Sequence, residues 1–518
     1  MPQRCLTGAD ALVHAAATAG IRVCFANPGT TEMPLVAALD RVDGVRAVLG
    51  LHENVCTGAA DGYARVAGHA AMTLLHLGPG LANGLANLHN VRRANTFVVN
   101  VVGDHASWHL RYDAPLTSDI AALAVTVGTV HTVRNPLIIG QIIRRAVEEA
   151  HRLRGVTTVI VPADHQQAPA ALPSRDTWRP PTLPGVGSVR VEAVAARLQA
   201  AGPKGVLLLG GNALSRAGQA AALRIATVTG AALYAETFPA RAERGGGLPD
   251  VDRLPYFPEV ALALLADKDV VAVAGAQEPI SYFGYEGIPS VLTRPGTLVQ
   301  LARPHEDAEA ALLELADLIG GGGGSAVRQP AAEQPGEDQS LTGPIVGRVV
   351  ASALPEGAIV SVEGATSGYP FYSASADGPA HTVLTNTGGA IGQGLPCALG
   401  AALAAPDRPV LALQSDGSGL YTAQALWTMA RERANVTVLI AANHTYGVLR
   451  TELGRHDNSQ FGPQASALTS LADPRMDWVA LAQGFGVPGL RVTTVRELRH
   501  ALNDAVTSDG PHLIEMAL

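Results

Sequence analysis

Short runs of consecutive apolar residues alternate with helical patterns along almost the whole chain of 518 residues. In the first third, these apolar runs occupy residues 23–26, 47–51, 72–77, 97–102 and 157–162. Helical patterns fit between them, for example over residues 7–19 and 81–94. Strands that are apolar at every position are typical of a parallel sheet that helices cover on both faces. The alternation therefore predicts an α/β fold built from doubly wound parallel sheets.

Two stretches with the composition of linkers divide the chain. Residues 162–188 are rich in proline, and residues 320–340 open with five glycines. The second and third blocks contain further apolar runs, at residues 206–210, 232–236, 270–275, 358–363, 410–415, 436–443 and 512–516. Since each block has the size of one domain, we predict three α/β domains, over residues 1–165, 186–320 and 340–518.

The composition argues against several classes of protein. Hydrophobic residues make up 47% of the chain and charged residues 16%, which allows large apolar cores. The formal charge of −8 disfavours a general nucleic-acid-binding role. No apolar run is long enough to span a membrane, and the four cysteines lack metal-ligand spacing. We therefore expect a cytoplasmic protein, in a reducing compartment, that binds neither nucleic acid nor membranes.

The most informative segment follows two neighbouring strands of the third block. Asp416 comes directly after the run 410–415, and Asn443 ends the run 436–443, which places it 27 residues later. One helix and one strand between them would bring both side chains to adjacent strand ends, where parallel sheets bind their ligands. Carboxylate and amide oxygens suit Mg²⁺, and the turn at Gly417 offers N–H groups to a phosphate. The segment predicts a Mg²⁺–diphosphate site, with a simple helix cap by Asp416 as the alternative.

Residues 415–418 (SDGS), followed by Asn443 and His444, resemble the signature of thiamine diphosphate-dependent enzymes, in which GDGS precedes a pair of asparagines. Ser415 and His444 depart from that signature. The resemblance implies that Mg²⁺ is held by Asp416, by the side chain of Asn443 and by the main-chain oxygen of Thr445. It further implies contacts with the cofactor from Thr366, Gly417, Ser418, Tyr446 and Gly447.

Two other segments resemble the part of this family that binds the pyrimidine ring. Glu53, in the segment 51–68, lies just after a predicted strand, where a carboxylate can also act only as a first-turn helix charge. The resemblance implies that Glu53 hydrogen-bonds N1′ of the aminopyrimidine and so promotes removal of the C2 proton. In the segment 385–396, it implies that the carbonyl of Gly389 accepts from the 4′-amino group and that Ile391 keeps the cofactor bent.

The substrate side is similar to benzoylformate decarboxylases and to acetolactate synthase large-subunit-like proteins. The resemblance implies that Thr30 meets the substrate carboxylate, although Thr30 or Thr31 can equally cap a helix over residues 32–40. It implies a catalytic role for His76, for which a structural role is the alternative. His105 is a candidate proton relay, with a solvated loop histidine as the alternative. The decarboxylases have a middle-domain histidine that is absent here, and Tyr282 or Phe283 occupies its approximate place.

These residues together predict a thiamine diphosphate- and Mg²⁺-dependent enzyme that decarboxylates a small 2-oxo acid without oxidation. The alternatives are a carboligase that joins the decarboxylated acid to a second carbonyl compound, as acetolactate synthase does, and an inactive cofactor-binding paralogue. We expect no FAD, because residues 210–218 lack the spacing of a dinucleotide fingerprint. The resemblance also implies a homodimer or homotetramer with active sites between subunits, and residues 451–475 are predicted to cover the site.

Overall fold

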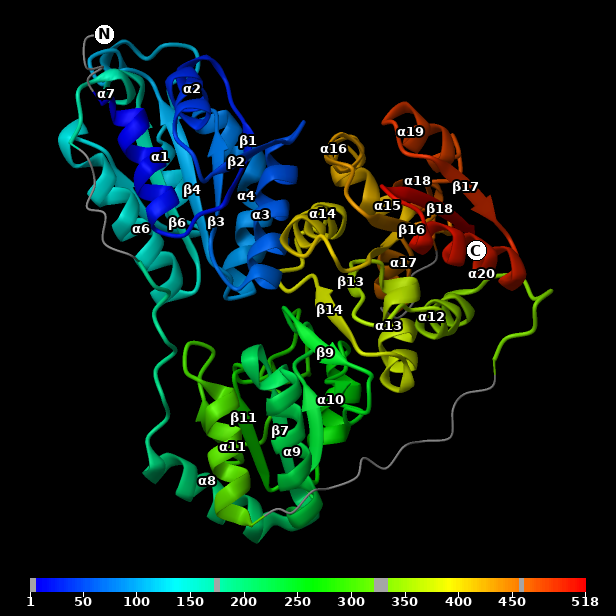
Figure 1. Cartoon of the computed structure of the whole chain (residues 1–518). Coiled ribbons are helices and arrows are strands. Elements are labelled where there is room, and N and C mark those ends of the chain that lie inside the picture. The colour runs from blue at the N-terminus through cyan, green and yellow to red at the C-terminus, as the bar shows by residue number, and fades with distance from the viewer. Residues whose placement is uncertain (1–5, 172–177, 321–333, 456–460) are drawn as a thin grey trace.

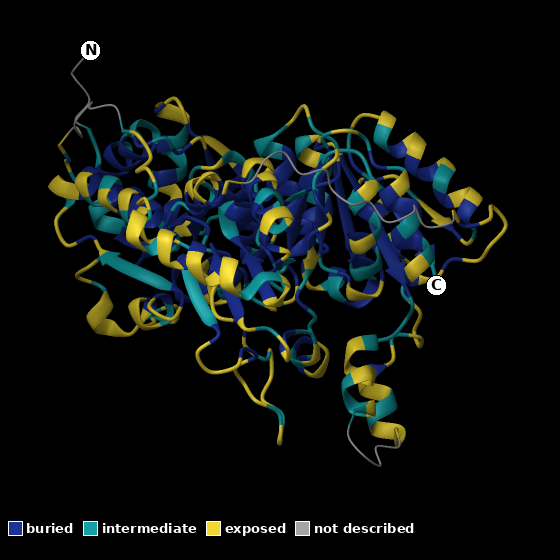
Figure 2. Cartoon of the chain, turned by 90° about the horizontal axis from the view of Figure 1, so that it is seen from below, coloured by how far each residue is buried: buried dark blue, intermediate teal, exposed yellow. Residues whose placement is uncertain are grey.

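Three helix-covered sheets make up the structure, a computed structural model that describes residues 6–171, 178–320, 334–455 and 461–518 (Figure 1). The predicted α/β fold with doubly wound parallel sheets is confirmed. Buried residues follow the strands and the inner faces of the helices, while exposed residues lie on outer helices and loops (Figure 2). Parts of both predicted linkers, residues 172–177 and 321–333, lie outside the described residues.

The N-terminal sheet has six parallel strands in the order β2-β1-β3-β4-β6-β5. The strands are β1 (Val23–Asn27), β2 (Arg46–Leu49), β3 (Ala71–Leu75), β4 (Val98–Asp104), β5 (Gly128–Thr132) and β6 (Val156–Pro162). One apolar core joins one face of this sheet to α1 (Gly8–Thr18), α2 (Met33–Arg41) and α6 (Ile139–Leu153). The opposite face packs against α3 (Glu53–Ala67), α4 (Leu77–Arg93) and α5 (Ile120–Ala124), and α7 (Ala163–Gln167) follows β6.

The middle sheet is also parallel, with the order β10-β8-β7-β11-β12. Its strands are β7 (Gly205–Leu209), β8 (Ala232–Ala235), β10 (Asp252–Arg253), β11 (Val270–Ala274) and β12 (Leu298–Ala302). Its helices are α8 (Ser188–Ala201), α9 (Arg216–Thr229), α10 (Pro258–Leu265) and α11 (Ala308–Ile319).

The C-terminal sheet has the order β17-β18-β16-β15-β13-β14-β9. Its strands are β9 (Ala242–Arg244), β13 (Ile359–Val362), β14 (His381–Thr385), β15 (Val410–Ser415), β16 (Val436–Ala442), β17 (Gly489–Val492) and β18 (His512–Ala517). Its helices are α12 (Gly343–Ser352), α13 (Ala365–Ala374), α14 (Gly394–Ala404), α15 (Asp416–Gly419), α16 (Ala425–Glu432), α17 (Gly447–Gly454), α18 (Pro463–Thr469), α19 (Trp478–Gly484) and α20 (Val495–Thr507). Only β9 is antiparallel, and it comes from the segment predicted as the middle domain, so the middle segment is tied directly to the C-terminal sheet. The predicted domain boundaries remain predictions.

Several strands have no counterpart in the sequence analysis. Five of them, β5, β9, β10, β12 and β17, lie at the edge of a sheet, where partly exposed residues interrupt the apolar run. The sixth, β14, is fully buried, but its polar residues His381, Thr382 and Thr385 break the pattern. Apolar runs therefore identify most central strands, with β14 as an exception, and they miss every edge strand except β2.

Helices α3 and α14 cross in direct backbone contact and join the N- and C-terminal units. A Cβ atom on Gly62 would lie 2.1 Å from the carbonyl oxygen of Cys397, and one on Gly400 would lie 1.9 Å from that of Ala59. One apolar core continues from the N-terminal sheet across this crossing into the C-terminal sheet. The two units therefore pack as one body, and the crossing requires glycine at both positions.

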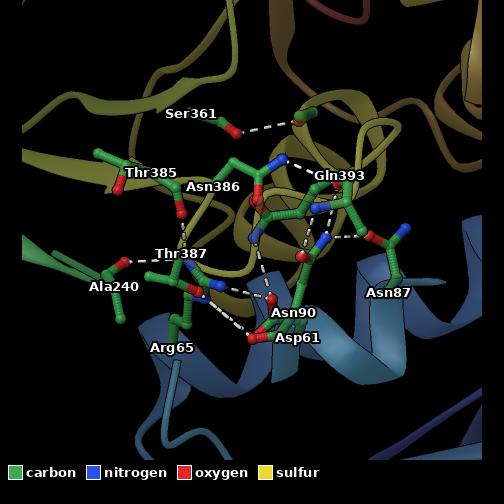
Figure 3. Close-up of polar contacts among 12 residues, drawn as sticks. Asp61, Arg65, Asn87, Asn90, Ala240, Ser361, Thr385, Asn386, Thr387 and Gln393 are labelled. Atoms are coloured by element: carbon green, nitrogen blue, oxygen red, sulfur yellow. Dashed lines mark hydrogen bonds and ion pairs between the residues drawn. The ribbon is translucent and has the colours of Figure 1, made fainter. Parts of the chain in front are cut away.

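A buried ion pair reinforces this crossing (Figure 3). Arg65 donates two hydrogen bonds to Asp61, of 2.9 and 2.6 Å, and is only 6% exposed. Its remaining amino group donates to the carbonyl oxygens of Thr385, at 2.7 Å, and Ala240, at 3.0 Å. Since these carbonyls belong to the C-terminal and middle segments, one guanidinium contacts all three parts of the chain.

We predict that His151 makes the N-terminal unit sensitive to acid. Its Nε2 accepts the Ala70 N–H at 3.2 Å, its ring stacks on Phe97, and burial lowers its pKa from 6.5 to about 4. Between these two pKa values, His151 takes up a proton in the unfolded chain but not in the folded state. The contribution of His151 to the free energy of unfolding is therefore fully present above pH 6.5 and decreases as the pH drops towards 4. Between pH 7.5 and 5.0 this site should cost about 2 kcal/mol of unfolding free energy.

Urea unfolding followed by tryptophan fluorescence at both pH values measures the effect, since Trp178 lies against His151. The variant His151→Gln keeps an acceptor but does not titrate, so it should lose less stability on acidification than the wild type. The partly exposed His14 provides the control His14→Gln, which should behave as the wild type does. Equal acid sensitivity of the wild type and His151→Gln would contradict the prediction.

Candidate active site

The paired strand ends predicted to hold a metal lie side by side. Ser415 of β15 pairs with Ala441 of β16, so Asp416 and Asn443 leave adjacent strands at the same edge of the sheet. The N–H of His444 donates to Oδ2 of Asp416 at 2.6 Å, which ties the two segments together. His444 has a φ of +52°, a left-handed conformation in which asparagine is common and histidine is tolerated. His444 is therefore compatible with the left-handed backbone of this turn.

Asp416 does not act as the cap of the helix that follows it. Asp416 is the first residue of α15, whose N-cap position is Ser415. Its Oδ1 accepts the N–H of Gly417 at 2.8 Å, and the side chain is almost fully buried. Burial raises the pKa of Asp416. Nδ1 of His444 lies 3.7 Å from Oδ2 of Asp416, and this nitrogen has no hydrogen-bond partner. Two backbone N–H groups partly compensate this buried charge, but no basic side chain of the described residues is in hydrogen-bonding contact with it, so the position suits a bound cation.

The other predicted metal and diphosphate residues surround Asp416. The amide nitrogen of Asn443 donates to the Thr366 hydroxyl at 3.3 Å, and its oxygen accepts the Thr445 N–H at 3.1 Å. Thr366 therefore reaches the site from the first turn of α13. A Cβ atom on Gly447, the first residue of α17, would find only one atom within 4 Å, at 3.9 Å, which leaves room for a ligand at this helix start.

These residues fit magnesium and a diphosphate. The described part of the chain contains no group of three or more His, Cys, Asp or Glu side chains suited to a metal. Magnesium needs few carboxylates, because it also accepts amide, carbonyl and phosphate oxygens. Asp416, Asn443 and Thr445 would hold the ion, and Ser418 and the N–H groups at the starts of α15 and α17 would face the diphosphate.

Tyr446 and the segment around Thr469 cover the turn of Asp416 and Gly417 at the end of β15. The ring of Tyr446 lies over Gly417, where a Cβ atom would lie 2.6 Å from it. Within the segment predicted to cover the site, the carbonyl of Thr469 accepts hydrogen bonds from the N–H of Tyr446, at 3.0 Å, and the hydroxyl of Thr445, at 2.9 Å. Residues 456–460 of that segment lie outside the described residues.

The predicted pyrimidine-binding turn precedes α14. Gly389 and Gly392 have φ values of +75° and +102°, and Ile391 is 40% exposed at the tip of the turn. The hydroxyl of Tyr282 lies against Gly389, since a Cβ atom there would be 1.5 Å from it. Of the two aromatic residues considered for the place of the missing histidine, Tyr282 is therefore the one that contacts this turn.

Glu53 lies near this turn within the same chain. It is the first residue of α3, is 8% exposed, and accepts a 3.0 Å hydrogen bond from Asn83. The amide of Asn87 donates both to the carbonyl of Asn54, at 2.8 Å, and to that of Gly392, at 3.1 Å. This geometry pairs Glu53 with the turn without a second subunit, so the expectation of sites shared between chains remains a prediction.

His76 lies beside Glu53 and is held by a buried carboxylate. A Cβ atom on Gly80 would lie 3.3 Å from Oε1 of Glu53 and 3.4 Å from Cβ of His76. Nδ1 of His76 is 2.7 Å from Oε2 of Glu32, which is fully buried and also accepts the Gly29 N–H at 2.8 Å. When Nδ1 carries the proton donated to Glu32, Nε2 is the nitrogen left to act on a ligand.

The nearby hydroxyl groups differ from the predicted arrangement. The hydroxyl of Thr31 donates to Glu32 at 2.5 Å and lies 3.3 Å from Nδ1 of His76, whereas Thr30 is exposed. Neither threonine caps α2, because the helix begins at Met33 and its N-cap residue is Glu32. The capping alternative was wrong, and Thr31 is the hydroxyl that joins the His76 cluster.

His105 lies at the end of β4, in a loop beside Asp104. Its ring packs against that of His109, and its Nε2 is buried without a hydrogen-bond partner. Burial raises the pKa of Asp104, and the nearby charge of Glu32 raises it further. Gly103, two residues before His105, packs against the carboxylate of Glu32, and the role of His105 as a relay remains a prediction.

Sequence reasoning missed the residues that orient the predicted ones. In the sequence analysis, no role is assigned to five polar residues, Glu32, Asn83, Asn386, Gln414 and Glu363. The available signal was a polar side chain at a strand end or helix start whose surroundings are apolar, as at Glu32 and Gln414.

Two family profiles match the chain. The N-terminal TPP-binding domain of thiamine pyrophosphate enzymes matches residues 6–124, and the C-terminal TPP-binding domain matches residues 365–516. A Mycobacterium tuberculosis protein named "Putative acetolactate synthase large subunit IlvX" is 46% identical over 99% of both chains. The chain belongs to the thiamine pyrophosphate enzyme family. Thiamine pyrophosphate is another name for thiamine diphosphate, so the predicted cofactor class is supported.

More distant relatives carry the names of decarboxylases and of acetolactate synthases. The benzoylformate decarboxylase of Pseudomonas aeruginosa is 29% identical over 96% of both chains. The structure of the 4-hydroxybenzoylformate decarboxylase of Rhodococcus jostii superposes with a TM-score of 0.86 over 99% of both chains, at 24% identity, which shows a shared fold. None of the helices among the described residues has the length and hydropathy needed to cross a membrane.

We predict that Asp416→Asn weakens magnesium-dependent binding of thiamine diphosphate by about tenfold to a hundredfold, because the ion loses its only carboxylate. Titration calorimetry with and without Mg²⁺ measures this change. Asp104 provides a matched control, since it is a buried carboxylate at a strand end of the N-terminal sheet. Asp104→Asn should leave cofactor affinity unchanged, and an equal loss in both variants would argue against a metal site at Asp416.

Proposed function

We propose that this protein decarboxylates a small 2-oxo acid without oxidation, using thiamine diphosphate and Mg²⁺. The observation that carries the proposal is the position of His76 next to Glu53, with its Nδ1 held by the buried carboxylate of Glu32. Such a pair would present an imidazole of fixed orientation near Glu53, which supports a role in proton delivery. The relatives named as decarboxylases support the same reaction class.

When bound, thiamine diphosphate would supply a ring that accepts the electron pair left on the substrate carbon when CO₂ departs. The residues of the chain bind and orient the cofactor and the substrate, and they move protons. Glu53, oriented by Asn83, would hold the proton shared with N1′ of the pyrimidine, and Gly389 and Ile391 would support the cofactor's shape. His76, through Nε2, would deliver a proton to the product carbon, and Thr30 or Thr31 would meet the substrate carboxylate.

A carboligase is the second candidate, favoured by the 46% identity to a protein named as an acetolactate synthase large subunit. The two reactions share every step up to the loss of CO₂. They differ in whether the product carbon takes a proton or attacks a second carbonyl compound. An ordered proton donor near that carbon favours the first outcome, and so the His76–Glu32 pair is our reason for ranking decarboxylation first. We also propose a cytoplasmic homodimer or homotetramer, as the family resemblance implies.

Product analysis tests the reaction directly. The purified protein is incubated with thiamine diphosphate, Mg²⁺ and a panel of 2-oxo acids that includes pyruvate and benzoylformate, and CO₂ and carbon products are quantified. We expect aldehyde and CO₂ in equal amounts. An acyloin or acetolactate would establish the carboligase instead. Bound cofactor without CO₂ from any acid would favour the inactive paralogue.

Variants of the two glutamates should separate their roles. Glu53→Gln should suppress exchange of the C2 proton of the bound cofactor and also CO₂ release, because both depend on Glu53. Glu32→Gln should leave C2–H exchange unchanged but lower product formation by about tenfold to a hundredfold, because His76 loses its ionic partner. Exchange of the C2 proton for deuterium from D₂O is measured as the loss of its proton NMR signal.

Glu306→Gln is the matched control for Glu32→Gln, since it removes a buried, ion-paired carboxylate of the middle segment and should leave both readouts unchanged. If Glu32→Gln released product at the wild-type rate, His76 would not be the proton donor.

A further inference from the structure

Glu363, the residue after β13, receives five hydrogen bonds. Oε1 accepts from the N–H groups of Gly392, at 2.7 Å, and Gln393, at 3.0 Å, and from the amide of Asn386, at 3.2 Å. Oε2 accepts from the N–H of Gly394, at 3.0 Å, and from the amide of Gln414, at 2.6 Å. Three consecutive backbone N–H groups at the start of α14 therefore converge on one carboxylate.

A carboxylate is the group required at this position. Every partner is a donor, so both oxygens must accept. An amide of the same size would turn an N–H₂ group towards other donors at one of the two oxygen positions. Hydrogen bonds to a charged acceptor are stronger than neutral ones, and the helix start adds a favourable dipole.

On one side, Glu363 fixes the turn that was predicted to bind the pyrimidine ring. It holds Gly392 and Gln393 directly after Ile391. It also orients Asn386, because the amide nitrogen of Asn386 faces Glu363 and its oxygen is left to accept the Gly389 N–H at 2.9 Å. The direction of the Gly389 carbonyl and the position of Ile391 thus depend on this carboxylate.

On the other side, Glu363 reaches the predicted diphosphate turn through Gln414. Because Glu363 takes the amide nitrogen of this buried side chain, the amide oxygen points to the next turn. There it accepts the hydroxyl of Ser418 at 2.9 Å and the N–H of Ser415 at 3.3 Å. A continuous hydrogen-bonded path therefore runs from the residues beside Gly389 to those beside Asp416.

We propose that Glu363 is a positioning residue that holds the pyrimidine turn and, through Gln414, the diphosphate turn in one fixed register, so that both ends of a bound cofactor meet prearranged groups. The proposal rests on the assignment of thiamine diphosphate as the cofactor, and it is independent of which 2-oxo acid is used. The simpler explanation is that Glu363 only caps α14, whose own N-cap residue, Gln393, makes no capping hydrogen bond with its side chain.

Binding measurements on Glu363→Gln separate these explanations. Calorimetry with Mg²⁺ gives the affinity for thiamine diphosphate, which probes both turns, and for inorganic pyrophosphate, which probes the diphosphate turn alone. We expect thiamine diphosphate affinity to fall by about tenfold to a hundredfold and pyrophosphate affinity to fall measurably as well. The matched control Asp307→Asn removes a carboxylate that caps α11 in the middle segment, and it should lower the melting temperature without changing either affinity.

A second variant, Gln414→Met, keeps the contacts of Glu363 with the backbone and removes the side-chain link that runs from Glu363 through Gln414 to Ser415 and Ser418. It should weaken pyrophosphate binding, and its effect should not add to that of Glu363→Gln. This variant also provides the test if Glu363→Gln does not fold. A lower melting temperature of Glu363→Gln with both affinities within twofold of the wild type would overturn the proposal in favour of a helix cap. Unchanged pyrophosphate binding in both variants would overturn the coupling of the two turns.

These readouts do not depend on turnover. If the wild type binds thiamine diphosphate but releases no CO₂ from any acid, the proposed reaction fails and the role of Glu363 stands. If the wild type does not bind thiamine diphosphate at all, the role of Glu363 is overturned.

Discussion

The crossing of α3 and α14 is the contact on which the rest of the structure depends. Gly62 and Gly400 let the two backbones touch, and any larger residue there would force the helices apart. Because α3 begins at Glu53 and α14 follows the turn of Gly389 and Ile391, this one crossing sets the distance between the candidate proton-handling carboxylate and the candidate pyrimidine turn. A displacement at the crossing would be transmitted directly to the site.

Polar contacts keep this crossing in a single register. Apolar contacts have little directionality, whereas a buried arginine must satisfy its donors or lose several kcal/mol, on the order of 3. Arg65 satisfies its donors with Asp61, Thr385 and Ala240, and Gln393 adds a hydrogen bond to Asp61 at 3.0 Å. Gln393 also donates its N–H to Glu363, so the network at the crossing continues into the carboxylate that orders the cofactor turns.

The site itself consists of reactive groups that are each fixed by a second polar residue. Glu32 holds His76, Asn83 holds Glu53, and Glu363 with Gln414 holds the turns on both sides of the predicted cofactor site. Such pairs restrict the orientation of side chains and backbone before any ligand arrives, which lowers the entropic cost of binding and of proton transfer. Structural prearrangement of this kind requires partners from several elements, and α4, η1 (Thr30–Glu32), β13 and β15 all contribute here.

The sequence by itself determined the fold class, most central strands and the residues at their carboxyl ends, because strand periodicity and strand-end motifs are local properties of the chain. From these, Asp416 and Asn443 could be named, and the family resemblance added Glu53, His76 and Gly389 as candidates. It did not reveal edge strands such as β5, whose residues are partly exposed, or the exchange of β9 into the C-terminal sheet. Only the tertiary structure decided that Thr31 rather than Thr30 joins His76, that Tyr282 contacts Gly389, and that Glu363 bridges the two turns. Those choices depend on which distant segments meet and in which orientation, and side-chain spacing along the chain carries no information about that.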